Sequence, residues 1–170
     1  EIEDVEGNVI HDIAKLTEGN LELILKKSSN IGASKIAFDL GAPKLEEYLR
    51  NFGFGAPTRS GFPGEPKGIL RPADHWVPVE LANISFGQGM AASGIQLAMA
   101  LGALANDGRL MQPLLVKRVL DGAGRVVQTW EPKEVRQVVS PETARTVLDL
   151  MQAVVEPDGT GKRAYIPEWP

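Results

Sequence analysis

The first half of the chain places its hydrophobic residues at the spacing of amphipathic helices. The stretch NLELILKK predicts a short helix over 20–27, with Asn20 as its N-cap and two lysines in its last turn. Apolar residues at i, i+3, i+4 and i+7 predict a second helix over 30–40, and Pro43 opens a third that ends at Gly53. Nearer the N-terminus, a small hairpin is predicted around residues 6–8.

The second half changes its pattern several times. Five glycines and five prolines within residues 53–78 predict a long ordered loop. Residues 93–107 are apolar nearly all round, which predicts a central, buried helix. Two runs rich in β-branched residues, 114–120 and 125–130, flank a Gly-rich turn and predict a hairpin. Ser-Pro-Glu then opens a last helix over 140–155.

Composition and charge exclude several classes of function. The formal net charge is −4 and no basic run occurs, so nucleic acid is not an expected partner. No apolar stretch reaches the roughly 20 residues needed to span a bilayer. The acidic start argues against a signal peptide, and the missing initiator Met suggests a piece of a longer chain. With no cysteine, and with His11 and His75 far apart, we expect neither a metal site nor another cofactor.

Two candidate motifs are better explained as structural features than as catalytic or binding sites. The stretch DGTGK at 158–162 lacks the spacing and the hydroxyl of a phosphate-binding loop, and it is typical of a turn after a helix. The neighbouring carboxylates Glu46 and Glu47 lie off the apolar stripe of their helix, so we expect them to be solvated. Neither stands out as an acid with a raised pKa in a cleft.

The tripeptide Ser28-Ser29-Asn30 lies between two predicted helices and has two interpretations. It can be a structural boundary, in which Asn30 ends one helix and caps the next through its side-chain oxygen. It can also be part of a catalytic site, in which Ser28 and Asn30 face a cleft. Short polar side chains at a helix start have few rotamers, so they suit both roles.

Four segments, in order along the chain, resemble the transpeptidase domain of class B penicillin-binding proteins, particularly the septal, cell-division type. They are ILKKSSNIGASKIAFDLG, NFGFGAPTRSGFPGEPKG, ELANISFGQG with IQLAMALGALANDG, and VVEPDGTGKRAYIP. The resemblance extends over about residues 7–168, so the whole chain, 1–170, is expected to be part of one transpeptidase domain.

That family uses the motifs S-x-x-K, S-x-N and K-T-G. Ser28-Ser29-Asn30 matches the second, whereas the first and third are absent from this sequence. The resemblance implies that Ser28 relays a proton to the leaving nitrogen. It implies that Asn30 hydrogen-bonds the substrate amide and the lysine of the absent S-x-x-K motif. We therefore expect an internal fragment that lies between the outer motifs and is inactive alone.

The resemblance also indicates the fold and the remainder of the site. The family's domain has a central sheet and a mostly helical lobe, so this chain should be mainly α with a β-hairpin, its central sheet largely missing. Phe86 and Gln88, in SFGQG, are expected to line the cleft wall, although Phe86 could instead be ordinary core. Ser29 is expected to contribute to substrate binding and to act locally as well. Helix faces left uncovered could make the chain self-associate.

The implied function is peptidoglycan D,D-transpeptidation during septal wall synthesis. The parent protein would bind the stem peptide and β-lactams, contact membrane proteins of the division machinery, and be anchored in the cytoplasmic membrane with its catalytic domain in the periplasm. The fragment itself would be soluble. Two alternatives stay open: a fragment of another acyl-serine enzyme, such as a β-lactamase or D,D-carboxypeptidase, and a helical interaction module without enzymatic ancestry. The latter predicts that Ser28 and Asn30 face no cleft.

Overall fold

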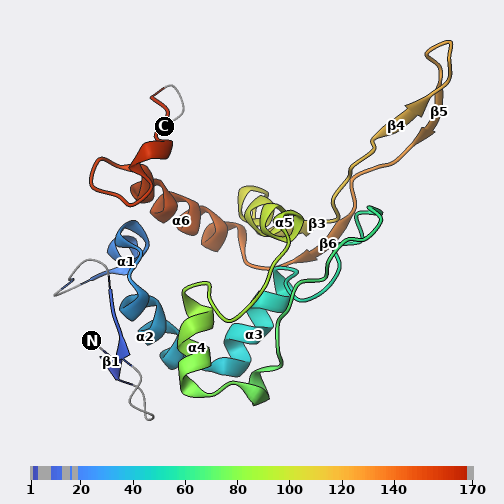
Figure 1. The fold of residues 1–170 in the computed structure, drawn as a ribbon. Coiled ribbons are helices and arrows are strands. Elements are labelled where there is room, and N and C mark those ends of the chain that lie inside the picture. Colours follow the sequence, from blue (N-terminus) through green and yellow to red (C-terminus); the bar gives the residue numbers. More distant parts are fainter. Residues whose placement is uncertain (1, 4–8, 13–15, 17–18, 168–170) are drawn as a thin grey trace. The chain divides into compact units, whose positions relative to one another are not determined.

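The computed structural model describes residues 2–3, 9–12, 16 and 19–167 (Figure 1). These residues form two compact units. The first contains the described residues up to Tyr48, together with 71–90 and 145–167, and the second contains 49–70 and 91–144. Each unit is therefore discontinuous in sequence.

The first unit is mainly helical. Its only strands among the described residues form an antiparallel pair, β1 (Ile2–Glu3) and β2 (Val9–Ile10). Its helices are α1 (Leu21–Lys27), α2 (Asn30–Leu40), most of α3 (Ala42–Asn51), α4 (Pro78–Ser85) and the larger part of α6 (Pro141–Gln152). Short 3-10 turns are η1 (Ala73–His75), η2 (Ala153–Val155) and η3 (Lys162–Ala164).

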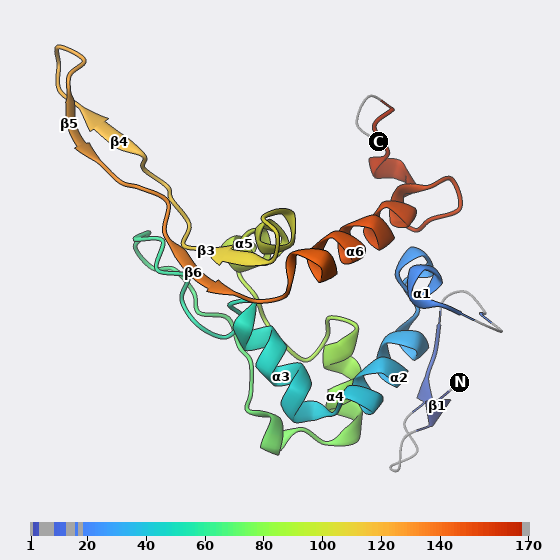
Figure 2. The ribbon, with the colours of Figure 1, turned by 180° about the vertical axis from the view of Figure 1, so that it is seen from behind.

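Small side chains bring α2 and α4 together. The two helices lie side by side in both views (Figures 1 and 2). Ser34 and Ala37 of α2 and Ala82 of α4 are buried, and Ile84 adds a larger apolar side chain to the same core. The Ser34 hydroxyl donates to the carbonyl of Asn30, 2.8 Å away, so its burial leaves no hydroxyl proton unsatisfied. This packing fixes the helix that begins with Asn30.

The second unit combines one helix with a long β-ribbon. Its elements are the end of α3, the loop that follows it, α5 (Gly94–Ala105), β3 (Arg109–Met111), β4 (Arg118–Leu120), β5 (Val126–Thr129), β6 (Glu134–Gln137) and the start of α6. β3 pairs antiparallel with β6, and β4 pairs antiparallel with β5 further along the same ribbon (Figure 1). α5 packs against β3.

The loop over 53–70 is ordered by contact with the short segment that leads into α5. Ile69 forms a two-way backbone bridge with Ala91, with N–O distances of 2.8 and 2.9 Å. Gly68, at φ +68°, precedes this bridge, and a Cβ there would lie 2.4 Å from the carbonyl oxygen of Ala91. Only glycine therefore fits at this crossing.

Most of the elements predicted from the sequence are confirmed. Asn20 caps α1 by accepting from the N–H of Leu23, and Ser93 and Ser140 accept from the N–H groups of Gln96 and Thr143 at the starts of α5 and α6. The predicted hairpin is β4–β5, and its turn is held by the Asp121 carboxylate. The N-terminal hairpin is also present as the β1–β2 pair, although its turn residues 6–8 lie outside the described residues.

Three predictions are corrected. α5 is not buried all round: Leu97 and Leu101 are 50% and 54% exposed, because only the face carrying Gln96, Ala100 and Ala103 packs within its unit. The last helix becomes a 3-10 turn after Gln152. Elements α4, β3 and β6 lie where the pattern predicts none, although Pro78 at the first turn and an acid after it are helix-start signals.

The observed architecture is mainly α with a β-hairpin, as predicted. The strands of the described residues form only two-stranded sheets, and no larger central sheet is present among them. Within the same part of the chain, no helix combines the length and apolar character needed to cross a membrane.

Candidate functional site

The Ser28-Ser29-Asn30 segment forms a sharp corner between α1 and α2. Ser28 follows the last turn of α1 in the left-handed conformation, at φ 53° and ψ 53°. The N–H of Ser28 donates to the carbonyl of Leu25, and that of Ser29 to the carbonyl of Ile24, at 3.1 and 2.9 Å. These bonds satisfy carbonyls at the C-terminus of α1, so a one-residue reversal separates the two helices.

Ser29, and not Asn30, caps α2. The Ser29 hydroxyl accepts from the N–H of Gly32 at 2.9 Å and donates to one carboxylate oxygen of Asp12 at 2.7 Å. The second carboxylate oxygen of Asp12 accepts from the N–H of Ile31 at 3.0 Å. Ser29 is only 5% exposed. The interpretation in which Asn30 caps the helix is therefore wrong, because Asn30 is already the first helical residue.

Asn30 and Ser28 keep polar atoms open at this corner. The carboxamide nitrogen of Asn30 donates to the carbonyl of His11 at 3.1 Å, which orients its side chain. Its carboxamide oxygen, like the exposed Ser28 hydroxyl, has no hydrogen-bond partner among the described residues. Both groups are thus free to meet a ligand. Their catalytic roles, and substrate binding by Ser29, stay predictions.

Two lysines in the last turn of α1 clamp an acidic turn beside the corner. The ammonium group of Lys26 lies 2.5 Å from a carboxylate oxygen of Glu156 and 2.7 Å from one of Asp158. The ammonium group of Lys27 lies 3.1 Å from the other Asp158 oxygen and donates to the Asp158 carbonyl at 2.6 Å. Hydrogen bonds to Asp158 and Glu156 raise the pKa of Lys26, whose side chain is only 11% exposed.

Hydrogen bonds from Lys26 and then Lys27 lower the pKa of Asp158 to about 2, so the turn stays charged at neutral pH. Backbone contacts complete the clamp. The carbonyl of Lys26 accepts from both the N–H and the hydroxyl of Thr160. A Cβ at Gly159 would lie 2.1 Å from the carbonyl oxygen of Val154, so this turn requires glycine. The predicted DGTGK turn is confirmed, and it is tied to the helix end that leads into Ser28.

Phe86 and Gln88 lie in the turn that ends α4. Phe86 is the C-cap residue and is half-buried, whereas the side chain of Gln88 is exposed. The N–H of Gln88 donates to the carbonyl of Asn83 at 2.8 Å, and Gly87 and Gly89 adopt positive φ on either side. No hydrogen bond among the described residues joins this turn to Ser28 or Asn30. A cleft-wall role for Phe86 and Gln88 stays a prediction.

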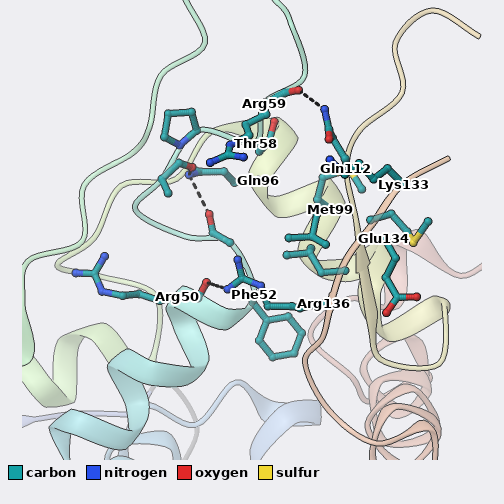
Figure 3. A pocket seen from close by; sticks show the side chains of 16 residues that line it. Arg50, Phe52, Thr58, Arg59, Gln96, Met99, Gln112, Lys133, Glu134 and Arg136 are labelled. Carbon is teal, nitrogen blue, oxygen red and sulfur yellow. Dashed lines mark hydrogen bonds between the residues drawn. The ribbon is translucent and has the colours of Figure 1, made fainter. Parts of the chain in front are cut away.

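A pocket of about 370 Å³ lies entirely within the second unit (Figure 3). Its walls come from the loop after α3, from α5 and from the β3–β6 pair. None of the five residues that the sequence predicts for the site lines it. Among the described residues, no group of three His, Cys, Asp or Glu side chains is arranged to hold a metal ion.

Sequence reasoning missed the residues that support the corner. Asp12 precedes its partner Ser29 by 17 positions, and Glu156 follows Lys26 by 130, so local periodicity cannot pair them. The sequence does contain one signal for the second pairing: a turn with acidic residues and two glycines could complement a helix that ends in two lysines. Glu46, predicted to be solvated, instead accepts from the N–H of Ala73 at 2.7 Å.

Comparison with known proteins identifies the family. The penicillin-binding protein transpeptidase domain matches residues 5–170. The chain belongs to this family. Its mainly α architecture with a hairpin is that of a partial transpeptidase domain, as the sequence predicts.

Relatives among characterised proteins agree with this assignment. Over 149 residues the chain is 36% identical to penicillin-binding protein PbpB of Mycolicibacterium smegmatis, covering 84% of this chain and 23% of that protein. Over 163 residues it is 37% identical to the probable peptidoglycan D,D-transpeptidase PbpC of Pseudomonas aeruginosa, covering 96% of this chain and 27% of that protein. The chain thus spans about a quarter of the length of these relatives.

Solved structures show the same transpeptidase fold. The apo transpeptidase domain of Burkholderia pseudomallei penicillin-binding protein 3 matches with a TM-score of 0.83 and 35% identity, over 96% of this chain and 46% of that one. Penicillin-binding protein 3 of Mycobacterium tuberculosis, complexed with ampicillin, matches with a TM-score of 0.83 and 32% identity, over 93% of this chain and 36% of that one.

Proposed function

We propose that this chain is part of a peptidoglycan D,D-transpeptidase that cross-links stem peptides ending in D-Ala-D-Ala and is acylated by β-lactams. The observation that carries the proposal is the family match over residues 5–170, with an S-x-N motif whose outer two residues keep polar atoms open. The ampicillin complex of a relative supports β-lactams as ligands of the longer protein.

Acyl transfer by a serine requires a nucleophile with a base, donors for the oxyanion, and a proton for the leaving amine. We assign the last of these to Ser28, whose exposed hydroxyl can both accept and donate a proton. We assign amide recognition to Asn30, because its carboxamide oxygen is open while its nitrogen is held by the carbonyl of His11. Ser29 holds both neighbours in place by capping α2.

The nucleophile and base are not supplied by this sequence, which contains neither S-x-x-K nor K-T-G. We therefore propose that the chain alone does not acylate. Losing even one oxyanion donor costs about 3–4 kcal/mol of transition-state stabilisation, and the K-T-G strand that would supply one is absent here.

The test is labelling by a fluorescent penicillin, followed by a denaturing gel. The expected result is no label on this chain and a covalent label on a longer protein that carries all three motifs. A labelled band at 18.4 kDa refutes the inactivity of the chain. A longer protein that contains the motifs, is folded and takes no label refutes the transpeptidase assignment.

The finer cellular assignments are also proposals. We place the longer protein in septal wall synthesis, anchored in the cytoplasmic membrane with this region in the periplasm and in contact with membrane proteins of the division machinery. The resemblance of the four sequence segments supports this placement. A fluorescent fusion of the longer protein is expected at division sites, and uniform labelling of the cell periphery contradicts the septal role.

Self-association of the isolated chain is supported by the outer face of α5, where Leu97 and Leu101 stand one turn apart and are each half exposed. Sedimentation velocity should show mass rising with concentration, and the Leu97→Lys/Leu101→Lys variant should stay monomeric. A wild-type chain that is monomeric at high concentration contradicts this proposal.

A further inference from the structure

The pocket of the second unit has a size and construction that the transpeptidase assignment does not explain. Its volume of about 370 Å³ falls in the range of small-molecule sites. Figure 3 shows its side chains arriving from the loop after α3, from α5, and from the β3–β6 pair. All three sources belong to one compact unit, so the pocket does not depend on how the two units are placed.

The pocket has a surplus of positive charge. Four of its lining residues are basic and only Glu134 is acidic. Neither Arg59 nor Lys133 makes an ion pair with any described residue, and the same is true of Glu134. The guanidinium of Arg136 donates only to a neutral group, the carbonyl of Arg50, at 3.4 Å. The charges of Arg59, Lys133 and Arg136 are therefore available to an anion.

The backbone of Arg59 is held in a conformation that a non-glycine residue rarely adopts. Its φ is +61°, in the left-handed region. The Glu65 carboxylate accepts from the N–H groups on either side of it, at 2.5 Å from Thr58 and 3.3 Å from Ser60. The side-chain amide of Gln112 donates to the carbonyl of Arg59 itself at 2.8 Å. Such enforced strain is common at binding sites, where it places a side chain.

Glu65 is a durable anchor for this arrangement. The Thr58 hydroxyl beside it, together with the N–H groups of Thr58 and Ser60, lowers the pKa of Glu65 to about 2. Its carboxylate therefore stays ionised throughout the physiological range and is engaged by the loop. It makes no ion pair with Arg59.

The wall next to Arg59 is equally rigid. Gln96 is 1% exposed, and its amide nitrogen donates to the carbonyls of Ala56 at 2.8 Å, Lys67 at 2.9 Å and Gly53 at 3.3 Å. Its amide oxygen accepts from the N–H of Ser93 at 2.8 Å. One buried side chain thus fixes the loop at three points, so the pocket is formed before any ligand arrives.

We propose that this pocket binds a small oxyanion, a carboxylate or phosphate group, through Arg59 and Arg136 with Lys133 as a further cation. The planar fork of a guanidinium matches both oxyanions and can bind them through two parallel hydrogen bonds. Glu134 disfavours a second negative group on its side of the pocket, which limits the ligand to one that presents its charge toward the arginines.

The proposal is tested by titrating the ¹⁵N-labelled chain with inorganic phosphate and, separately, with butyrate, a monocarboxylate, at low ionic strength. Saturable amide shifts are expected at Arg59, Gln112 and Gln96. Saturation by phosphate alone assigns a phosphate-bearing ligand, and saturation by butyrate alone assigns a carboxylate. Shifts that do not saturate with either probe, or that saturate only outside the pocket, overturn the proposal.

Variants identify the residues responsible. Arg59→Gln and Arg136→Gln should each weaken binding about tenfold, the effect of losing one charge-assisted hydrogen bond or more. The matched control is Arg118→Gln, an exposed arginine of β4 in the same unit but outside the pocket, which should leave affinity within about twofold. An equal loss in all three variants indicates a general charge effect and overturns the site. Unchanged affinity in the folded Arg59→Gln and Arg136→Gln variants overturns it as well.

Discussion

Ser28 and Ser29 are adjacent in sequence but lie in opposite environments. Ser29 is buried, and its hydroxyl is engaged by Gly32 and Asp12. Ser28 is exposed in a left-handed conformation, and its hydroxyl is open. The sequence predicts catalysis for Ser28 and substrate binding for Ser29, and it gives the capping role to Asn30 instead. The structure separates them because only one hydroxyl can reach the first N–H groups of α2.

Replacing Ser28 by glycine tests whether the Ser28 hydroxyl contributes to folding stability or only to the reaction. Glycine accepts φ near +53° without strain, while it gains more freedom in the unfolded chain. These effects oppose each other, so Ser28→Gly should change the free energy of unfolding by less than about 1 kcal/mol. Urea unfolding of the chain measures this. A loss of several kcal/mol shows that the hydroxyl has a structural role that the open site does not reveal.

Ser29 is expected to behave in the opposite way. Ser29→Ala removes the cap and leaves one of the two carboxylate oxygens of Asp12 without its donor, so it should lower the free energy of unfolding by about 2 kcal/mol. Asp12→Ala should cost a similar amount. Urea unfolding of the double variant should show a smaller loss than the sum, because the two residues share one hydrogen bond. Strict additivity argues against their coupling.

At the scale of elements, short helices with caps were the most predictable. α1 and α6 begin where Asn20 and Ser140 indicate, because a cap followed by apolar spacing is a local signal. The apolar spacing also gives the range of α2, although its cap is Ser29 and not the predicted Asn30. The burial of α5 was not predictable in the same way. An apolar composition all round the helix is compatible with burial on every face, and only tertiary contacts reveal that Leu97 and Leu101 stay exposed.

The ordered loop over 53–70 should make stability depend on acid pH. The pKa of Glu65 is lowered from 4.5 to about 2 in the folded chain, so the folded state binds fewer protons than the unfolded state between these values. Glu65 therefore contributes stability that is fully present above pH 4.5 and is lost as the pH falls toward 2.

Thermal unfolding from pH 7 to pH 2 measures this dependence. The wild-type Tm should fall below about pH 4.5, and Glu65→Gln should flatten the curve over that window while lowering stability at pH 7. Asp158, whose pKa is also about 2, and Asp121, whose pKa is lowered by hydrogen bonds from Arg125, contribute in the same direction, so some slope should remain. A Glu65→Gln curve parallel to the wild-type curve contradicts the role of Glu65.

At the scale of the whole molecule, the sequence was sufficient to recognise the family but not to assemble the site. The S-x-N tripeptide and the flanking segments are contiguous in sequence, and the family match confirms the family that they indicate. The clamp between Lys26 and Glu156 and the pocket around Gln96 join residues far apart along the chain. No local pattern encodes such pairings, because they exist only once the chain has folded.

We propose that Ser28 and Asn30 act directly in the reaction at this corner and that Ser29 holds both of them in place. The most direct measurement is the acylation rate of a longer, motif-complete protein by a fluorescent penicillin, with substitutions numbered by this chain. Ser28→Gly and Asn30→Ala should each slow acylation or the turnover of a stem-peptide substrate by about 100-fold at unchanged Tm, while Ser140→Ala should have no effect on rate. Wild-type rates in folded Ser28→Gly and Asn30→Ala proteins would contradict these roles for Ser28 and Asn30.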